Sequence, residues 1–486
     1  MKIRLNRREM MKSVAGLSVA GGMAGMFTGC QPASPAPVQM KEEINVGVSP
    51  PGPKSLELLE RMKKVIGRTN YVGLYGVAIA DGAGAYVADL DGNVYLDCLA
   101  AATTNVLGYS HDEVAEAYFE AAKRMQNSCF PYSTNVYAVE LAENLVRIAP
   151  GDFPKKALLG LSGSDSCGGS IEAMRKFTGR TALIKFENAY HGSTGLSQPA
   201  SGFRSLNEGI YPPSPDFISM PFPVTEERRD EVLSQIDSIL AQGKVGAVMA
   251  EPIQGDAGIL VPAEGFFPRL REMLDGYGVL LIVDEVQSGM GRSGKWWAIE
   301  HEGITPDIMV VAKGLSGGYA PISALIGRQE IIDALAPAQH LFTYTGHPPA
   351  SAAATAVIRT IEKEGIAGNA GRMGDRILAG LRVVQQNHPD VLVEARGRGL
   401  MLGCEIDVSK DELAGKIFAM RCLEKGIYFG YFGDKQQVLR IEPPLIIDEG
   451  QADLIVSTVG EVAKEMQSGT IPQATIDKVR NYAIGL

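Results

Sequence analysis

The chain has 486 residues, of which 45% are hydrophobic and 21% are charged, and its formal net charge is −10. This length supports more than one domain with a sizeable core, and the composition is ordinary for a globular protein. The acidic balance argues against nucleic acid or an anionic membrane surface as a partner. The six cysteines are scattered and form no CxxC pair, which argues against a disulfide framework and against a metal site.

The first 53 residues differ in character from the rest of the chain. The segment from Asn6 to Lys12 contains Arg7-Arg8 and resembles a twin-arginine export signal, and the charge-free stretch 13–29 is shorter than a membrane-spanning helix. Residues 1–29 therefore predict an export signal. Phe27-Thr28-Gly29-Cys30 resembles a lipobox, which predicts a lipid anchor at Cys30, with a simple cleaved signal or a basic tail as the alternatives. Residues 30–53 are rich in Pro and Ala and predict a tether, so we expect an exported protein that is periplasmic or membrane-anchored.

After the tether, the pattern predicts an α/β fold with two domains. Residues 54–107 read as short strands and turns, with a hairpin around Asp91-Gly92-Asn93, and predict the N-terminal part of a small domain. Residues 108–357 alternate helical periods with buried apolar runs, which predicts a large domain with a mostly parallel sheet covered by helices. Residues 358–486 complete the smaller α+β domain. The predicted strands of the large domain are 157–161, 181–186, 245–250, 279–283 and 308–312.

Polar or glycine-rich residues follow each of these five strands. Ligands of open α/β sheets bind outside the carboxyl ends of the strands, so these residues are expected to meet at one edge. They are Ser162-Gly163-Ser164-Asp165, Asn188-Ala189-Tyr190-His191-Gly192, the segment from Glu251 to Asp256, the segment from Asp284 to Gln287, and Lys313.

The acid Asp284 and the amine Lys313 suit one cofactor well, pyridoxal 5'-phosphate. Its aldehyde needs a lysine for a Schiff base, and its pyridine nitrogen needs a carboxylate to stay protonated. A buried Asp284 without a cation would be costly, and a pyridinium is such a cation. The pair therefore predicts an enzyme that uses this cofactor.

The other strand ends offer the remaining contacts that this cofactor requires. Gly163 and Ser164 open a helix whose N-terminus can hold a phosphate, although Ser164 or Asp165 could instead be an ordinary helix cap. Tyr190 is suited to stacking on the ring, and His191 either contacts the cofactor or supports a residue that does. Val286 would pack against the ring and Gln287 would reach its hydroxyl group.

The segment Gly289–Gly294 matches the dinucleotide-binding pattern GxGxxG. In a dinucleotide site these glycines follow the strand directly, whereas here Asp284 and Glu285 stand between and would repel a pyrophosphate. We therefore do not interpret the segment as a nicotinamide site.

From about Leu56 to Ala463, the chain resembles the class III pyridoxal-phosphate aminotransferases of fold type I. The resemblance implies that Lys313 is the Schiff-base lysine, and that Asp284 is the partner of the ring nitrogen. It implies a homodimer with shared active sites, in which Thr343 reaches the phosphate of the neighbouring subunit and Arg440 binds a substrate carboxylate. It also places Asp165 and Glu251 among the cofactor contacts. The motifs that carry it are 162–165, 190–194, 251–255, 284–287, 312–314, 343–348 and 440–445.

The sequence departs from the family pattern at two places, in the phosphate-binding segment and at Asp256. The phosphate-binding segment continues Ser166-Cys167-Gly168-Gly169 in place of Ala-Asn-Glu, and glycines there weaken a helix by roughly 1 kcal/mol each. Asp256 stands where many members have Glu, and its surroundings resemble the amino-acid racemase and 2-epimerase branch of the class.

The leading hypothesis is an aminotransferase that moves an amino group between an amino acid or amine and a 2-oxo acid. The alternative is a racemase or 2-epimerase on the same scaffold, in which Asp256 serves as a second catalytic acid or base. The sequence does not identify the amino donor or acceptor.

Overall fold

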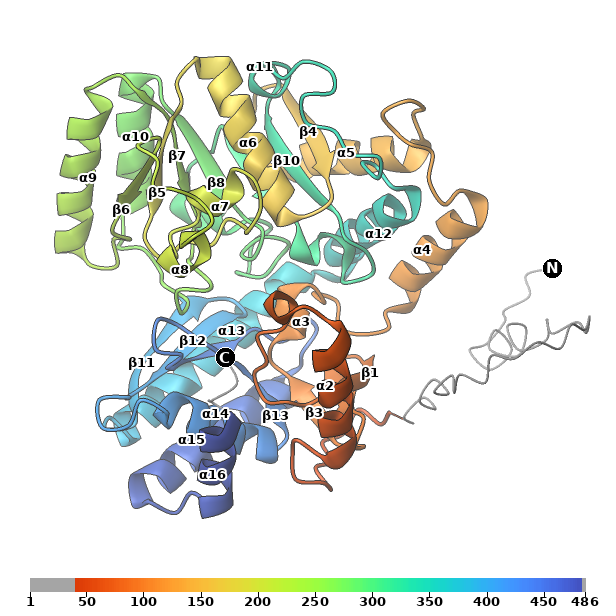
Figure 1. The fold of residues 1–486 in the computed structure, drawn as a ribbon, viewed down its shortest axis with the longest axis vertical. Coiled ribbons are helices and arrows are strands. Elements are labelled where there is room, and N and C mark those ends of the chain that lie inside the picture. The colour runs from red at the N-terminus through yellow and green to blue at the C-terminus, as the bar shows by residue number, and fades with distance from the viewer. Residues whose placement is uncertain (1–39, 483–486) are drawn as a thin grey trace, which may run out of the picture. The chain divides into compact units, whose positions relative to one another are not determined.

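A computed structural model describes residues 40–482, so the predicted export signal, Cys30 and the first part of the tether lie outside the described residues. The described residues group into one unit by their contacts (Figure 1). Within the described range, no helix is both long enough and apolar enough to cross a membrane.

A seven-stranded sheet forms the core of the large domain and has the strand order β4-β10-β9-β8-β7-β5-β6. Only β10 runs against its neighbours; the other strands share one direction, so their carboxyl ends lie at one edge. The central strands are fully buried, as their continuous apolar runs predict. The strands are β4 Lys155–Gly160, β5 Ala182–Phe186, β6 Phe217–Met220, β7 Val245–Ala250, β8 Leu280–Asp284, β9 Ile308–Val311 and β10 Ser323–Arg328.

Helices connect these strands and cover the sheet (Figure 1). Helix α6 packs on β4, β7, β8, β9 and β10 of the sheet, and α12 packs on α4 and α5. The helices of this part are α4 Asp112–Arg124, α5 Val136–Ile148, α6 Gly163–Thr178, α7 Ser197–Ala200, α8 Arg204–Asn207, α9 Glu226–Leu240, α10 Phe266–Tyr277, α11 Gln329–Ile332 and α12 Pro348–Glu364.

The small domain combines segments from both ends of the chain. Strand β13 of the C-terminal part pairs in parallel with β3 of the N-terminal part, in a sheet of order β1-β2-β3-β13. A second sheet has the order β11-β12-β15-β14. The strands are β1 Ile79–Ala83, β2 Tyr86–Asp89, β3 Val94–Asp97, β11 Leu392–Arg398, β12 Met401–Ile406, β13 Ile427–Tyr428, β14 Gly430–Phe432 and β15 Val438–Ile441.

The helices of the small domain pack on these two sheets and on each other. Gly365 separates α12 from the long helix α13, which begins at Ile366 and packs against α15 and β11. The packing partners therefore change at Gly365, and the domain boundary at 357 stays a prediction. The helices are α2 Pro53–Val65, α3 Ala100–Thr103, α13 Ile366–Asn387, α14 Ala414–Glu424, α15 Glu449–Ser468 and α16 Gln473–Tyr482.

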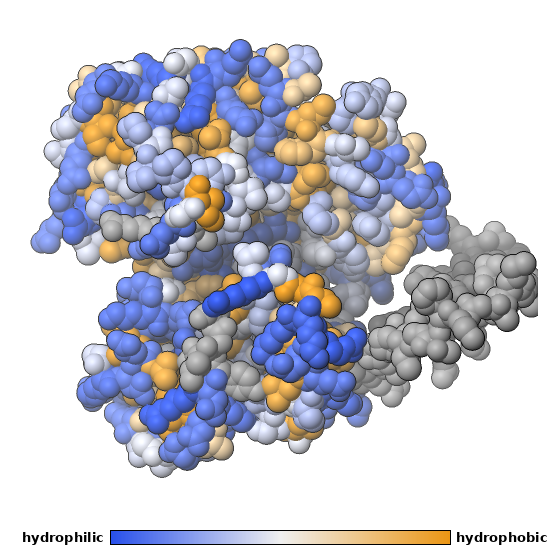
Figure 2. Space-filling model, in the orientation of Figure 1, coloured by the Kyte–Doolittle hydropathy of each residue, from blue (hydrophilic) through white to orange (hydrophobic). Residues whose placement is uncertain are grey.

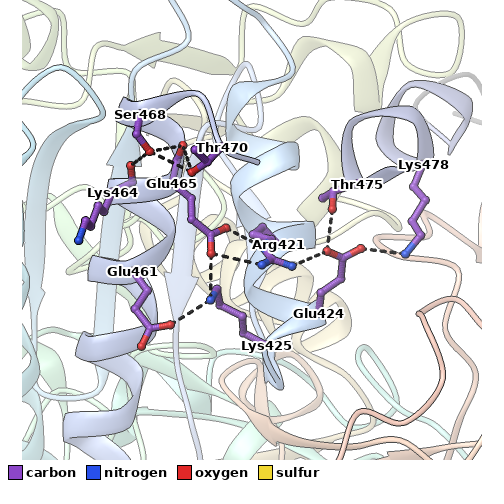
Figure 3. A network of polar contacts seen from close by, with 10 residues as sticks. All are labelled: Arg421, Glu424, Lys425, Glu461, Lys464, Glu465, Ser468, Thr470, Thr475 and Lys478. Atoms are coloured by element: carbon purple, nitrogen blue, oxygen red, sulfur yellow. Dashed lines mark hydrogen bonds and ion pairs between the residues drawn. The ribbon is translucent and has the colours of Figure 1, made fainter. Parts of the chain in front are cut away.

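Charged side chains join the last three helices (Figure 3). Arg421 of α14 donates to Glu465 of α15 at 2.6 Å, and Lys478 of α16 donates to Glu424 of α14 at 2.8 Å. Several connected ion pairs contribute more than isolated ones, so this network fixes α16 on the small domain.

The N-terminal part of the small domain departs from the expectation in two places. Strands and turns were expected from residue 54, but α2 occupies Pro53–Val65, because Asp91 of the hairpin accepts hydrogen bonds from the backbone N–H groups of Lys54 and Ser55. Pro53 in the first turn and Lys63 and Lys64 in the last turn are local signals of this helix that the sequence analysis did not use. The end of the predicted tether is also ordered against the hairpin: Asn45 pairs with Val94, and the Val48 N–H donates to Asn93.

The surface view shows hydrophilic and hydrophobic residues interspersed, without a continuous apolar band on the face drawn (Figure 2). The five cysteines of the described range are free, and four of them are buried.

Candidate active site

Lys313 follows β9 at the carboxyl edge of the large sheet and begins a short 3-10 helix, Lys313–Ser316. Its backbone has a positive φ of 33°, which is uncommon for a residue with a side chain. The next residue has to be glycine, because a Cβ on Gly314 would lie 2.6 Å from Val106. The Lys313 Nζ donates to Oε1 of Gln287 at 3.1 Å.

Asp284 ends β8, the strand beside β9, and only 3% of the residue is exposed. Its Oδ2 lies 2.7 Å from Nδ1 of His191 and accepts from the Cys167 thiol at 3.4 Å, while Oδ1 accepts from the Val286 N–H at 3.0 Å. These contacts satisfy the buried carboxylate from the protein side and fix its direction. His191 Nε2 is buried and has no hydrogen-bond partner among the described residues.

The N-terminus of α6 lies beside Asp284 and Lys313. Ser162 caps the helix by accepting from the Asp165 N–H, and Asp165 completes the capping box. The first N–H groups of a helix lack intrahelical partners and carry partial positive charge, which makes this turn an anion site. A side chain at position 163 would crowd Val286, because a Cβ on Gly163 would lie 3.0 Å from that residue.

These groups line one cavity of about 440 Å³. It is bounded by Ser162, Gly163, Ser164, Tyr190, His191, Asp284, Val286 and Lys313, together with Thr104 and residues 316–322. The structure thus brings together Gly163, Ser164, Tyr190, His191, Asp284, Val286 and Lys313 of the predicted site.

Glu251 does not line the cavity but holds the loops that do. Its two carboxylate oxygens accept from the Tyr190 N–H at 2.9 Å and the Gly255 N–H at 3.1 Å. Burial raises the pKa of Glu251 to about 7. Glu251 therefore positions Tyr190, and its expected contact with the cofactor stays a prediction.

Asp165 likewise does not line the cavity. Its Oδ2 accepts from the N–H groups of Leu161 and Ser162, at 2.7 and 3.1 Å, and its Oδ1 accepts from Ser323 at 3.0 Å. The carboxylate of Asp165 therefore caps the helix, and its expected contact with the cofactor stays a prediction.

Arg440, on β15, is buried and charge-compensated within the chain. Its guanidinium pairs with Asp256, lies 3.3 Å from Glu442, and lies over the Phe432 ring at 3.5 Å. Burial raises the pKa of Asp256, but the charges of Arg440 and Lys313 outweigh this effect, and the net shift is downward. Asp256 is therefore an ionised acid close to both cations.

Thr343 lies on an exposed loop before α12 and is not among the residues that line the cavity of its own chain. The segment Gly289–Gly294 is structural, since the buried Arg292 donates to the carbonyl oxygens of Leu400 and Pro443. This contact joins the large domain to the small one.

The site fits pyridoxal 5'-phosphate. The helix N-terminus at Gly163 and Ser164 suits the phosphate, the buried Asp284 suits a protonated ring nitrogen, and Lys313 supplies the amine. Tyr190 and Val286 offer flat and apolar surfaces to the ring.

The fold and this site define a pyridoxal-phosphate enzyme of fold type I. Residues 68–462 match the family model described as "Aminotransferase class-III", and the chain belongs to this family. The protein is a pyridoxal-phosphate-dependent enzyme of the aminotransferase type.

Curated relatives include racemases and aminotransferases. An alanine/serine racemase of Pyrococcus horikoshii is 34% identical over 462 residues, covering 90% of this chain and 96% of that protein. An acetylornithine aminotransferase of Methanopyrus kandleri is 38% identical over 395 residues, covering 81% of this chain and 96% of that protein.

Solved structures of aminotransferases are similar to this chain as well. The ornithine aminotransferase of Toxoplasma gondii superposes with a TM-score of 0.78 at 26% identity, covering 85% of this chain and 95% of that chain.

Two residues of the site were missed by the sequence analysis. Cys167 donates to Asp284 from the helix α6, and Glu442 contacts both Arg440 and Gln287. The alternation along β15 could have indicated Glu442, because residues 440 and 442 of a strand point to the same face.

Proposed function

We propose that the protein transfers an amino group between an amino acid or amine and a 2-oxo acid. The observation that carries this proposal is the meeting of Lys313 and the buried Asp284 in one cavity beside the N-terminus of α6. When bound, pyridoxal phosphate supplies an aldehyde carbon and a ring that withdraws electrons.

The chain's own residues then have distinct roles. Asp284 holds a proton at the ring nitrogen, and His191, Cys167 and the Val286 N–H hold Asp284 in place. Lys313 Nζ, when free, would take the proton from the substrate Cα and deliver it, on the same face, to the carbon that the cofactor's aldehyde supplies. Arg440 and Asp256 form a charge pair, and Asp256 is partly exposed. A substrate carboxylate can therefore displace Asp256 and bind Arg440 in its place.

The test is product analysis of the purified holoenzyme with a panel of amines and D- and L-amino acids, with and without a 2-oxo acid. Amino transfer requires that products form only when the 2-oxo acid is present. Inversion of an amino acid without it would refute transfer as the main activity.

Racemisation or 2-epimerisation is the second candidate. It is favoured by the racemases among the relatives and by Asp256, an ionised carboxylate whose pKa responds to the charge of Lys313. A racemase needs a second acid–base group besides Lys313, and a carboxylate can serve.

Asp256→Asn separates the two candidates. In heavy water, NMR of an L- and a D-amino acid should show that this variant loses exchange with inversion but keeps exchange with retention, if Asp256 moves the second proton. Asp256→Glu should preserve amino transfer if Asp256 only neutralises Arg440. Wild-type protein that never inverts either enantiomer would end the racemase candidate.

We also propose a homodimer with shared active sites. Large apolar side chains are exposed beside Thr343, namely Leu341 at 42% and Tyr344 at 57%. Tyr132 at 87% and Val136 at 59% are exposed as well, and exposed apolar patches are typical of subunit interfaces. The test mixes Lys313→Ala with Thr343→Ala subunits. A mixed dimer has one site with both changes and one with neither, so activity should exceed that of both parents. No gain on mixing, with dimers exchanging subunits, would contradict sharing.

Export is proposed from the sequence of residues 1–53. A reporter fused to this segment should leave the cytoplasm, and changing Arg7 and Arg8 to Lys should retain it there. Cys30→Ala should abolish metabolic fatty-acid labelling if the anchor exists. Export that ignores the arginine change contradicts the twin-arginine reading.

A further inference from the structure

Glu442 is a fully buried carboxylate to which the proposed reaction assigns no role. It lies just after β15, its residue is 0% exposed, and its backbone N–H donates to the Cys98 carbonyl at 2.8 Å. A buried charge is costly unless it is paired and hydrogen-bonded, so its contacts indicate what it does.

Both oxygens of Glu442 accept from one group, the side-chain amide of Gln287. The Nε2 of Gln287 donates to Oε1 at 2.9 Å and to Oε2 at 3.1 Å. A carboxylate can only accept, so it fixes the amide with its NH₂ end toward Glu442. The carbonyl end is thereby turned the other way, and it accepts from Lys313 Nζ at 3.1 Å.

The backbone around Gln287 leaves room for this orientation. A Cβ on Gly255 would lie 2.2 Å from Gln287 Oε1, so a larger residue there would displace the amide. The chain thus connects Glu442, Gln287 and Lys313 in one line of hydrogen bonds.

We propose that Glu442 is a positioning residue for Lys313. By fixing the Gln287 amide, it presents a carbonyl acceptor that holds one N–H of the lysine, so that the amine is directed toward the substrate Cα. This inference rests on the proposed function only in that Lys313 moves a proton.

Other charged groups face Glu442 and define the competing role. The Arg440 Nε lies 3.3 Å from Glu442 Oε2, and Arg292 donates to the carbonyl of the adjacent Pro443. If Glu442 served only to neutralise Arg440, its effect would be independent of Gln287.

The test is a double-variant cycle with Glu442→Gln and Gln287→Met. Glutamine at 442 offers a donor as well as an acceptor, so the Gln287 amide is no longer fixed. Each single change should lower kcat about tenfold with little change in KM, and the double variant should lose no more than either single one. Multiplying losses would overturn the proposal, because Glu442 would then act through another group.

A second readout uses no substrate. The pH midpoint of the bound cofactor's visible absorption reports the lysine nitrogen, and it should move to lower pH in both single variants and no further in the double variant. If Glu442→Gln does not fold, Gln287→Met alone decides: an unchanged midpoint and kcat refute the proposal. Glu461→Gln, at a surface contact with Lys425, is the matched control and should leave both readouts unchanged.

The two readouts also separate this inference from the proposed function. A wild-type protein that binds the cofactor but transfers no amino group refutes the function, while the absorption midpoint still tests the role of Glu442.

Discussion

At the residue scale, the site depends on how a buried carboxylate is satisfied. Asp284 has three donors on the protein side, from His191, Cys167 and the Val286 backbone, and faces the cavity with Lys313. These contacts orient the carboxylate toward the cavity, where a protonated ring nitrogen would give it a charged partner.

Asp284→Asn tests this arrangement. The variant keeps one oxygen and the shape of the side chain, so the fold and part of the cofactor binding should remain. Proton removal at the substrate Cα should fall by about 10²-fold or more, because the ring nitrogen loses its charged partner. Stopped-flow absorbance of the half-reaction measures this step, and near-normal turnover would mean that Asp284 is not the partner of the ring.

The sequence could predict the residues that contact the cavity because each follows a buried strand. Tyr190, Asp284 and Lys313 come from that rule alone. The roles of Asp165 and Glu251 could not be predicted, since an acid next to a helix start or a loop is equally able to accept backbone N–H groups. The alternation along β15 could indicate that Glu442 lies on the same side as Arg440, but its contact with Gln287 depends on the tertiary packing of the two domains.

At the element scale, helix α6 explains one departure from the family pattern. The helix is continuous from Gly163 to Thr178 despite Gly168 and Gly169, and both glycines are buried. A Cβ on Gly169 would lie 2.8 Å from His340 Nε2, whereas one on Gly168 would meet nothing within 4 Å. Only Gly169 is therefore required by packing.

The two glycines form a matched pair of variants. Gly168→Ala should stabilise the protein by roughly 0.5–1 kcal/mol, because alanine loses less entropy in a helix. Gly169→Ala should destabilise it by about 1–3 kcal/mol, because His340 is held by Glu172 and cannot move freely. Urea unfolding measures both, and changes of the same sign would contradict the packing explanation.

The turn α3 beside the cavity is strained. Four consecutive residues, Ala100 to Thr103, have positive φ, and the next residue, Thr104, lines the cavity. A left-handed conformation costs a residue with a side chain roughly 1–2 kcal/mol. Nothing in the local sequence indicates this turn, since alanine favours a right-handed helix.

Ala101→Gly should relieve part of this strain. Ala101 is exposed and has φ 49° and ψ 51°, so glycine removes no packing and should raise stability by about 1 kcal/mol. Ala115→Gly in the right-handed helix α4 is the control and should lower stability by about 1 kcal/mol. Thermal unfolding of the two variants measures both changes. A lower stability of Ala101→Gly as well as of Ala115→Gly would contradict the explanation that Ala101 is strained.

Strands β6 and β10 were missed by the sequence analysis. Strand β6 has only four residues, and β10 runs antiparallel between β4 and β9, so the place of β10 depends on the sheet rather than on its own pattern. The five predicted runs were found within a residue or two of their expected ends, because continuous apolar runs of that length mark buried strands.

At the scale of the whole molecule, buried acids make stability depend on pH. Burial raises the pKa of Glu285 from 4.5 to about 7, and its carboxylate accepts from Ser288 and from the Ile299 N–H. Between these two values the folded protein binds more protons than the unfolded chain, so stability falls as pH rises.

Glu285→Gln removes this contribution. The neutral amide keeps the shape, and the Ser288 hydroxyl can rotate to accept from it. The loss of stability between about pH 5 and pH 7 should be smaller in the variant by about 2 kcal/mol. Urea unfolding at constant, saturating pyridoxal phosphate measures this, and parallel curves for the two proteins would contradict a raised pKa.

Segments far apart in the sequence make up the small domain. The N-terminal hairpin is completed by β13, and Arg292 of the large domain binds carbonyls of the small one. The sequence predicted that both chain ends contribute to this domain.

The central claim is that Lys313 carries the cofactor, and borohydride reduction of the holoenzyme followed by peptide mapping tests it most directly. Lys313 meets Asp284 in the cavity, whereas Lys185, a buried lysine on β5, is held by the carbonyl oxygens of Pro199 and Ser201. We expect the reduced cofactor on Lys313 alone, and we expect Lys313→Ala to remove both the label and the visible absorption. A label on Lys185 or on any other lysine would contradict it.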